Sequence, residues 1–284
     1  MMKVTIIGGG KVGSTIAKKL ETIDSVSYQV VYNSDATKEK LLEQEITESS
    51  IVDWESADFN CDIVLICVKD YQIEQVAKQL SESITNGSPL VVHTSGTKRK
   101  EILEVFIDKG FTIAAAHPYQ TFAESESDIL DGIPWGLDVG GDSADKLEQF
   151  ISLISGKPVK LSDETLDTKS LYHISAVAAS NFMALSVELA KNIAEESNIS
   201  WEQFLPHIMR TTLDNNLNED SDEPAITGPV VRGDVETVKN HVSALGESVN
   251  GVIYKNMSES LALMALDKGL ISGEKFEELM EVLA

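Results

Sequence analysis

Two side chains that can donate a proton, Lys169 and His173, stand four residues apart in the second half of the chain. On a helix, residues at this spacing lie on the same face, with Cβ atoms about 5–6 Å apart. We expect His173 to donate a proton or to orient a bound molecule, with Lys169 beside it. The alternative is a buried histidine that only hydrogen-bonds to the backbone.

Three more polar residues stand where they could contact the same molecule. The turn at Ser95 could offer a hydroxyl and a backbone N–H to a carboxylate, or its side chain could cap a helix that begins near Lys98. His117 directly follows an apolar run, so it could reach the bound molecule or cap a neighbouring group within a turn. Asn181 could bind the reacting group or only its helical neighbours. No spacing of ligand residues predicts a metal site.

A glycine turn near the start, Gly8-Gly9-Gly10-Lys11-Val12-Gly13, lies between the apolar residues 4–7 and an amphipathic stretch that begins at Ser14. A glycine turn between a strand and a helix lets a pyrophosphate approach the backbone, where free N–H groups meet the positive end of the helix dipole. The pattern predicts a dinucleotide site that includes Gly8, Gly10, Lys11, Val12 and Gly13.

The second predicted strand, residues 28–32, ends at Asn33-Ser34. An Asp or Glu at this position would bind the free 2′-hydroxyl of NAD. The neutral side chains of Asn33 and Ser34, followed by Lys38 and Lys40, favour the 2′-phosphate of NADP instead. Asp35 keeps NAD open as the alternative.

Strands and helices alternate through residue 161, which predicts an α/β fold with a doubly wound, Rossmann-type sheet as the first domain, residues 1–161. The continuous apolar run over residues 62–68 is typical of a strand buried on both faces. Ligands bind outside the carboxyl ends of such strands. We therefore expect Val68 and Asp70, at the end of this run, to lie at the cofactor.

From residue 162 the pattern contains helices only, which predicts an all-α, substrate-binding domain over residues 162–284. Residues 170–187 include no Asp, Glu, Lys or Arg, in a chain that is 24% charged. Leu171, Ile174 and Phe182 recur at helical spacing and predict a buried core face. The opposite side is small and mildly polar, so we expect both sides of this helix to be covered.

Composition excludes several classes of partner. The formal net charge of −23 argues against binding to nucleic acid or to an anionic membrane surface. The two cysteines, Cys61 and Cys67, lie in or beside one apolar strand and are expected to be core thiols, as suits a reducing cytoplasm. We expect no stretch of 18 residues to be apolar enough to span a bilayer.

With these residues in hand, the chain resembles the bacterial Rossmann-like oxidoreductases that carry a helical C-terminal domain of unknown function. These are relatives of ketopantoate reductase and pyrroline-5-carboxylate reductase in the 6-phosphogluconate dehydrogenase-like group. The motifs that carry the resemblance are Gly8-x-Gly10-x-x-Gly13, Val68-x-Asp70-x-x-Ile73, His93-Thr94-Ser95-Gly96, His117-Pro118-x-x-Thr121-Phe122, Tyr172-His173, Ser180-Asn181, Thr227-Gly228-Pro229 and Arg232-Gly233-Asp234.

The resemblance implies an NADP-dependent oxidoreductase that dimerises through its helical domain. In related hydroxyacid dehydrogenases, a Ser-Gly-Gly turn and a helical Lys-x-x-x-Asn form the active site. Here Thr97 follows Ser95-Gly96, and His173 stands where that asparagine would be, so His173 and Lys169 are equal candidates for the acid.

The expected reaction is reduction of a small carboxylate-bearing carbonyl or imine, with a ketopantoate-like 2-oxo acid as the most specific expectation. A non-catalytic, dinucleotide-binding regulatory module is the alternative.

Overall fold

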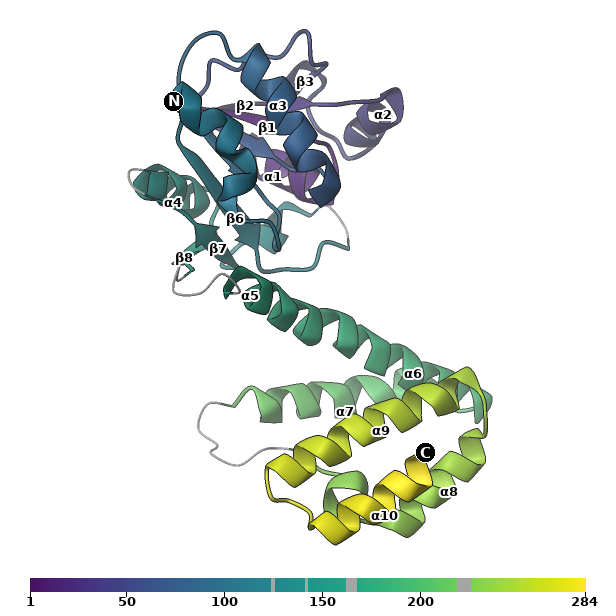
Figure 1. The fold of residues 1–284 in the computed structure, drawn as a ribbon. Coiled ribbons are helices and arrows are strands. Elements are labelled where there is room, and N and C mark those ends of the chain that lie inside the picture. Colours follow the sequence, from purple (N-terminus) through teal and green to yellow (C-terminus); the bar gives the residue numbers. More distant parts are fainter. Residues whose placement is uncertain (124–125, 141–142, 162–167, 219–225) are drawn as a thin grey trace. The chain divides into compact units, whose positions relative to one another are not determined.

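The computed structural model describes residues 1–123, 126–140, 143–161, 168–218 and 226–284. The chain divides into two compact units, Met1–Ser180 and Asn181–Ala284, and each is described by itself (Figure 1). The domain boundary that the sequence predicts, between residues 161 and 162, stays a prediction, because residues 162–167 lie outside the described part.

The first unit is built on one eight-stranded sheet with the strand order β3-β2-β1-β4-β5-β6-β7-β8. Strands β1 to β6 are parallel, β7 runs antiparallel to β6, and β8 runs parallel to β7. The strands are β1 (Met2–Ile7), β2 (Val26–Val31), β3 (Ile51–Val52), β4 (Ile63–Ile66), β5 (Leu90–His93), β6 (Ile113–Pro118), β7 (Pro134–Asp138) and β8 (Lys157–Lys160). This order confirms the predicted doubly wound, Rossmann-like sheet. Sequence patterning missed β3, which has only two residues.

Helices cover both faces of the sheet. On one face, α1 (Lys11–Glu21) and α4 (Ser143–Leu153) contribute to a core that includes Ile63 and Leu65 of β4. On the other face, α3 (Ile73–Ser83) and the 3₁₀ helix η3 (Lys100–Lys109) pack with Val64 and Ile66 of the same strand. The apolar run at β4 is therefore buried on both sides, as predicted.

The second unit contains only helices in its described part, as predicted. These are α6 (Met183–Glu196), α7 (Trp201–Asn216), the short η6 (Val230–Arg232), α8 (Val235–Leu245), α9 (Val249–Asp267) and α10 (Gly273–Leu283). Its core joins Val230, Val238, Ala262 and Leu279 from η6, α8, α9 and α10. In contrast, α6 and α7 contain no buried residue.

Helix α5 (Thr168–Val177) corrects the predicted core face. Leu171 and Ile174 are 61% and 59% exposed, so the described residues of the first unit do not cover the apolar stripe, and Phe182 of the second unit is 60% exposed. The polar side packs inward instead, because Lys169 is buried and the Tyr172 hydroxyl donates to the carbonyl of His117 on β6. Hydrophobic spacing identified the stripe correctly, but spacing alone cannot say which neighbour covers it.

The expectation that no stretch is apolar enough to span a bilayer was wrong. The helical residues Thr168–Glu196 pass a test of length and composition for a membrane span, with a mean hydropathy of 1.2. Residues 170–187 of this stretch include no Asp, Glu, Lys or Arg, which keeps its mean hydropathy high although serine, histidine and asparagine interrupt it.

Both cysteines are free thiols. Cys67 lies at the end of β4, where burial raises the pKa of its thiol to about 12, and Cys61 is half-buried. A buried thiol with a raised pKa is unreactive, so Cys67 is the core thiol that the sequence predicts.

Candidate functional site

The glycine turn after β1 packs directly on the end of β4. Gly8 has a φ of +109°, and a Cβ there would lie 2.8 Å from the carbonyl oxygen of Cys67. A Cβ on Gly13 would lie 2.0 Å from the carbonyl oxygen of Gly8. Gly10 is different, because no atom lies within 4 Å of a Cβ built there. Two glycines are thus required by packing, and the third leaves the turn open to solvent.

Helix α1 begins at this turn with uncapped donors. Its N-cap is Gly10, which offers no side-chain acceptor. The first backbone hydrogen bond of the helix is donated by the Ser14 N–H to the Gly10 carbonyl at 2.9 Å. The N–H groups of Lys11, Val12 and Gly13 have no partner among the described residues. Free amides at a helix N-terminus form a site for a phosphate group.

The end of β2 adjoins this turn through α2 (Asp35–Glu43), because a Cβ on Gly9 would clash with Thr37 and Leu41 of α2. Ser34 caps α2 by accepting from the Thr37 N–H at 3.3 Å, and the Thr37 hydroxyl donates to Asn33 Oδ1 at 3.2 Å. These contacts place Asn33 and Ser34 beside the glycine turn.

Val68 and Asp70 follow β4, but they do different things. Val68 Cγ1 lies 3.1 Å from a Cβ built on Gly8, so Val68 lines the glycine turn. The Asp70 carboxylate instead accepts hydrogen bonds from the hydroxyls of Ser95 and Thr97, at 2.8 and 2.7 Å. Asp70 therefore connects the loop after β4 to the loop after β5.

Two predicted site residues, His117 and His173, meet around Gly96. A Cβ on Gly96 would lie 2.3 Å from His173 Cδ2 and 2.8 Å from His117 Nε2. The two imidazole rings lie 5.6 Å apart between centroids, in an edge-to-face arrangement. Only glycine fits between them, and its buried N–H has no hydrogen-bond partner among the described residues. A buried donor without a partner is costly, and a bound ligand is one way in which it is satisfied.

Lys169 joins this group from α5. Lys169 is 5% exposed, and its ammonium donates to the carbonyl oxygen of Lys98. Burial lowers the pKa of Lys169 to about 8, although the charges of Asp138 and Asp70 offset part of this effect. Burial, together with the charges of His173 and Lys169, lowers the pKa of His117 to about 4, so that His117 is neutral at pH 7.

Ser95 does not cap a helix near Lys98, because η3 begins at Lys100 with Arg99 as its N-cap; its hydroxyl bonds within its own loop instead. Its hydroxyl accepts from the N–H groups of Thr97 and Lys98, at 3.2 and 3.0 Å, while it donates to Asp70. Asn181 is exposed and lies in a π-helical turn, Ala178–Phe182; it belongs to the second unit and is described with that unit.

His93 is a residue whose role the sequence analysis missed. It is fully buried at the end of β5, where its Nδ1 accepts from the Ser95 N–H at 3.2 Å and its Nε2 lies 3.1 Å from the Arg99 carbonyl oxygen. Burial lowers the pKa of His93 to about 4. A neutral imidazole thus holds both ends of the loop after β5. The position of His93 directly after an apolar run was the available signal.

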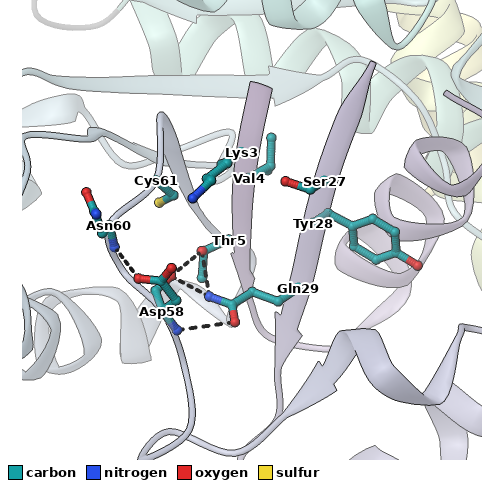
Figure 2. Close-up of a pocket in the computed structure, with 9 residues that line it drawn as sticks. All are labelled: Lys3, Val4, Thr5, Ser27, Tyr28, Gln29, Asp58, Asn60 and Cys61. Carbon is teal, nitrogen blue, oxygen red and sulfur yellow. Dashed lines mark hydrogen bonds between the residues drawn. The ribbon is translucent and has the colours of Figure 1, made fainter. Parts of the chain in front are cut away.

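A separate cavity of about 210 Å³ lies against the first halves of β1 and β2 (Figure 2). The Gln29 amide donates to Thr5 Oγ1 at 2.9 Å, and the Thr5 hydroxyl donates to the Asp58 carbonyl at 3.1 Å. These bonds tie the loop before β4 to the sheet, so they are structural. Among the described residues, no group of three His, Cys, Asp or Glu side chains could hold a metal ion.

Comparison with known families matches two separate parts of the chain. Residues 1–118 match the model of a Rossmann-like domain, and residues 133–261 match that of a domain of unknown function, DUF2520. No curated protein matched this sequence.

Several solved structures share the fold. A Bacteroides fragilis protein described as a candidate NADP oxidoreductase has a TM-score of 0.72 and 22% identity, over 92% of this chain and 98% of its own. Pyrroline-5-carboxylate reductase from Coxiella burnetii has a TM-score of 0.56 and 17% identity, over 99% and 98% of the two chains. An imine reductase from Streptomyces aurantiacus has a TM-score of 0.63 and 12% identity, over 99% of each chain.

The buried ammonium of Lys169 makes stability depend on pH. The folded chain loses this proton near pH 8 and the unfolded chain near pH 10.5, so the unfolded state binds more protons between these values. In that window, the free energy of unfolding of the wild type, relative to Lys169→Met, should rise by up to about 3 kcal/mol. Urea unfolding at pH 7 to 10 measures this difference.

Lys98→Met is the control, because Lys98 is an exposed lysine of the loop after β5. The free energy of unfolding of the wild type relative to Lys98→Met should not rise in that pH window. Buried thiols and tyrosines also titrate in this range. They change the free energy of unfolding equally in all the proteins compared, so their effect cancels in the differences. A constant difference between the wild type and Lys169→Met would contradict the assignment.

Proposed function

We propose that this chain, a Rossmann-like domain followed by a DUF2520 domain, is an NADP-dependent oxidoreductase. It reduces a carbonyl or imine on a small carboxylate-bearing molecule, with a ketopantoate-like 2-oxo acid as the most specific candidate. The observation that carries the proposal is the buried Lys169, bonded to the loop in which Gly96 meets two imidazoles, in the same unit as the glycine turn. The fold shared with pyrroline-5-carboxylate and imine reductases supports it.

The residues of the site divide the work of such a reduction. A reduced nicotinamide supplies the hydride, and the oxygen or nitrogen of the acceptor then needs a proton. Lys169 suits this step, because a pKa of about 8 leaves most of the ammonium protonated at pH 7 and lets it be regenerated readily. His117, with a pKa of about 4, is neutral there and orients the acceptor. His173 is the second candidate donor.

Gly96 supplies the donor for the acid group. Its N–H is buried and unpaired among the described residues, whereas the Ser95 hydroxyl already has its partners in the loop. A substrate carboxylate therefore binds the Gly96 N–H. Because a Cβ built on Gly96 would meet His117 and His173, an acid group bound at Gly96 would have both imidazoles as neighbours.

The phosphorylated cofactor is favoured by charge at the end of β2. Asn33 and Ser34 carry no carboxylate that would repel a 2′-phosphate; the Ser34 hydroxyl caps α2, and Asn33 Oδ1 accepts from the Thr37 hydroxyl. The Lys38 ammonium lies 5.7 Å from the ring centroid of Tyr32, the residue before Asn33, which keeps a cation at this edge. The likeness to a candidate NADP oxidoreductase agrees with this choice.

The glycine turn gives a direct test of dinucleotide binding. Gly10→Ala should leave the free energy of unfolding almost unchanged, because its methyl group enters open space and the backbone is extended (φ −74°, ψ −179°). The methyl stands where a pyrophosphate approaches the free amides, so the Kd for NADPH should rise at least tenfold, or about 1.4 kcal/mol. Fluorescence titration measures the Kd.

Gly273→Ala is the matched control, since its methyl also enters open space, at the start of α10. Equal Kd values for the two variants would exclude a dinucleotide at this turn. The same titrations compare the cofactors: we expect NADPH to bind the wild type at least tenfold more tightly than NADH, and the reverse order would assign NAD.

Catalysis is tested by NADPH oxidation with ketopantoate, related 2-oxo acids and pyrroline-5-carboxylate. Lys169→Met and His173→Ala should each lower kcat by at least a hundredfold, as expected for loss of a proton donor or its neighbour, with the Kd for NADPH unchanged. Lys98→Met is the control lysine for kcat.

Tight NADPH binding without turnover of any such acid would overturn the reductase proposal. That result would favour the alternative, a regulatory module that senses the dinucleotide.

We also propose that the protein is a homodimer through its helical unit. Helices α6 and α7 contain no buried residue, and Phe204 and Ile208 of α7 are 60% and 61% exposed. An apolar groove of about 690 Å³ runs between these helices. Apolar surface of this kind is covered in stable proteins, and a second copy covers it symmetrically.

Light scattering during gel filtration tests the dimer. The wild type should have twice the mass of one chain, and Phe204→Glu with Ile208→Glu should produce a folded monomer. Ile107→Glu is the control, because Ile107 is 55% exposed on η3 of the other unit. A monomeric wild type would refute the dimer.

A further inference from the structure

The Asp70 carboxylate occupies an unusual place between two loops. It follows β4 at the start of a short 3₁₀ turn, and its Oδ2 accepts from both the Ser95 and the Thr97 hydroxyls. Strands β4 and β5 are neighbours in the sheet, with Ile66 paired to His93. One carboxylate oxygen therefore fastens the loop after β5 to the loop that lines the glycine turn.

The fastened loop holds the reactive groups. Gly96 lies between Ser95 and Thr97, and it packs against both imidazoles. Two residues further on, the carbonyl oxygen of Lys98 accepts from the Lys169 ammonium. A shift of this loop would move the Gly96 N–H and the acceptor of Lys169 together. Asp70 thus acts on the site without needing to touch a substrate.

The charge of Asp70 acts on the same groups. It raises the pKa values of Lys169, His117 and His93, each of which burial lowers. Lys169 is faced by other charges too: Asp138 of β7 and Glu101 of η3 also raise its pKa, and Lys100 lowers it. Asp138 is already paired with the Lys100 ammonium at 2.7 Å, whereas both recorded partners of Asp70 are neutral hydroxyls.

We propose that Asp70 is a positioning residue: its carboxylate fixes the turn Ser95–Lys98, and its negative charge stabilises the ammonium form of Lys169. This role deepens the proposed function and rests on it for the identity of the proton donor. The role differs from the cofactor contact that the sequence suggested for Asp70.

Asp70→Asn tests the charge, because the amide oxygen can still accept from the two hydroxyls. The pH at which Lys169 loses its proton should fall by about half a unit to one unit. The alkaline limb of the kcat profile should move by the same amount, and kcat at pH 8 should fall about two- to fivefold.

Thr97→Val tests the positioning, because it removes one hydroxyl and keeps the charge. It should raise the KM for the acid several-fold and leave the alkaline limb in place. Asp53→Asn is the matched control: Asp53 also accepts from a loop serine, the Ser56 N–H at 2.8 Å, and the change should alter neither KM nor the profile. If Asp70→Asn does not fold, Asp70→Ser, which keeps a hydroxyl near Thr97, replaces it.

A readout without turnover separates the two proposals. The free energy of unfolding is measured against pH for Asp70→Asn and for the double variant Asp70→Asn with Lys169→Met. The difference between the two curves reports the loss of the Lys169 proton directly. Absence of turnover in the wild type would refute the reductase and leave this measurement valid. The pH midpoint of this difference gives the pH at which Lys169 loses its proton. If that midpoint is the same in Asp70→Asn and Asp53→Asn, the role of Asp70 is overturned.

Discussion

The site depends on keeping one ammonium group, that of Lys169, almost out of water. An isolated charge in such a place is strongly disfavoured, so its surroundings must supply an acceptor and compensating charge. The Lys98 carbonyl provides the acceptor, and Asp138 and Asp70 provide the charge. The loop after β5 and the start of α5 are therefore held together by the need to satisfy one buried cation.

Parallel strand order brings the other parts to the same edge. Strands β1, β4, β5 and β6 are consecutive neighbours, so the loops that follow them emerge side by side. Glycines then permit contacts that a Cβ would forbid: Gly13 against the backbone of Gly8, and Gly96 against two imidazoles. In an acidic chain of net charge −23, anion binding at this edge relies on backbone amides and a few placed lysines.

Hydrogen bonds within the loop after β5 explain why its polar residues are not interchangeable. His93 fixes the two ends of the loop, and the Ser95 hydroxyl accepts from the Thr97 N–H inside it. Asp70 ties the loop to the one that follows β4. With these groups all engaged, the Gly96 N–H is the free donor among the described residues of the turn. Preorganisation of this kind costs stability when the site is empty and aids binding when it is filled.

The sequence by itself determined the sheet, the glycine turn and the helical second half, because each depends on local periodicity or on a short run of glycines. It also placed Lys169 and His173 on one helical face, since that follows from their spacing. Tertiary structure decided the rest. Gly96, His117 and His173 meet only because β5, β6 and α5 converge, and no local pattern encodes a contact between residues so far apart. The same convergence turned the polar face of α5 inward and left Leu171 and Ile174 exposed, because the neighbours of a helix decide which of its faces is buried.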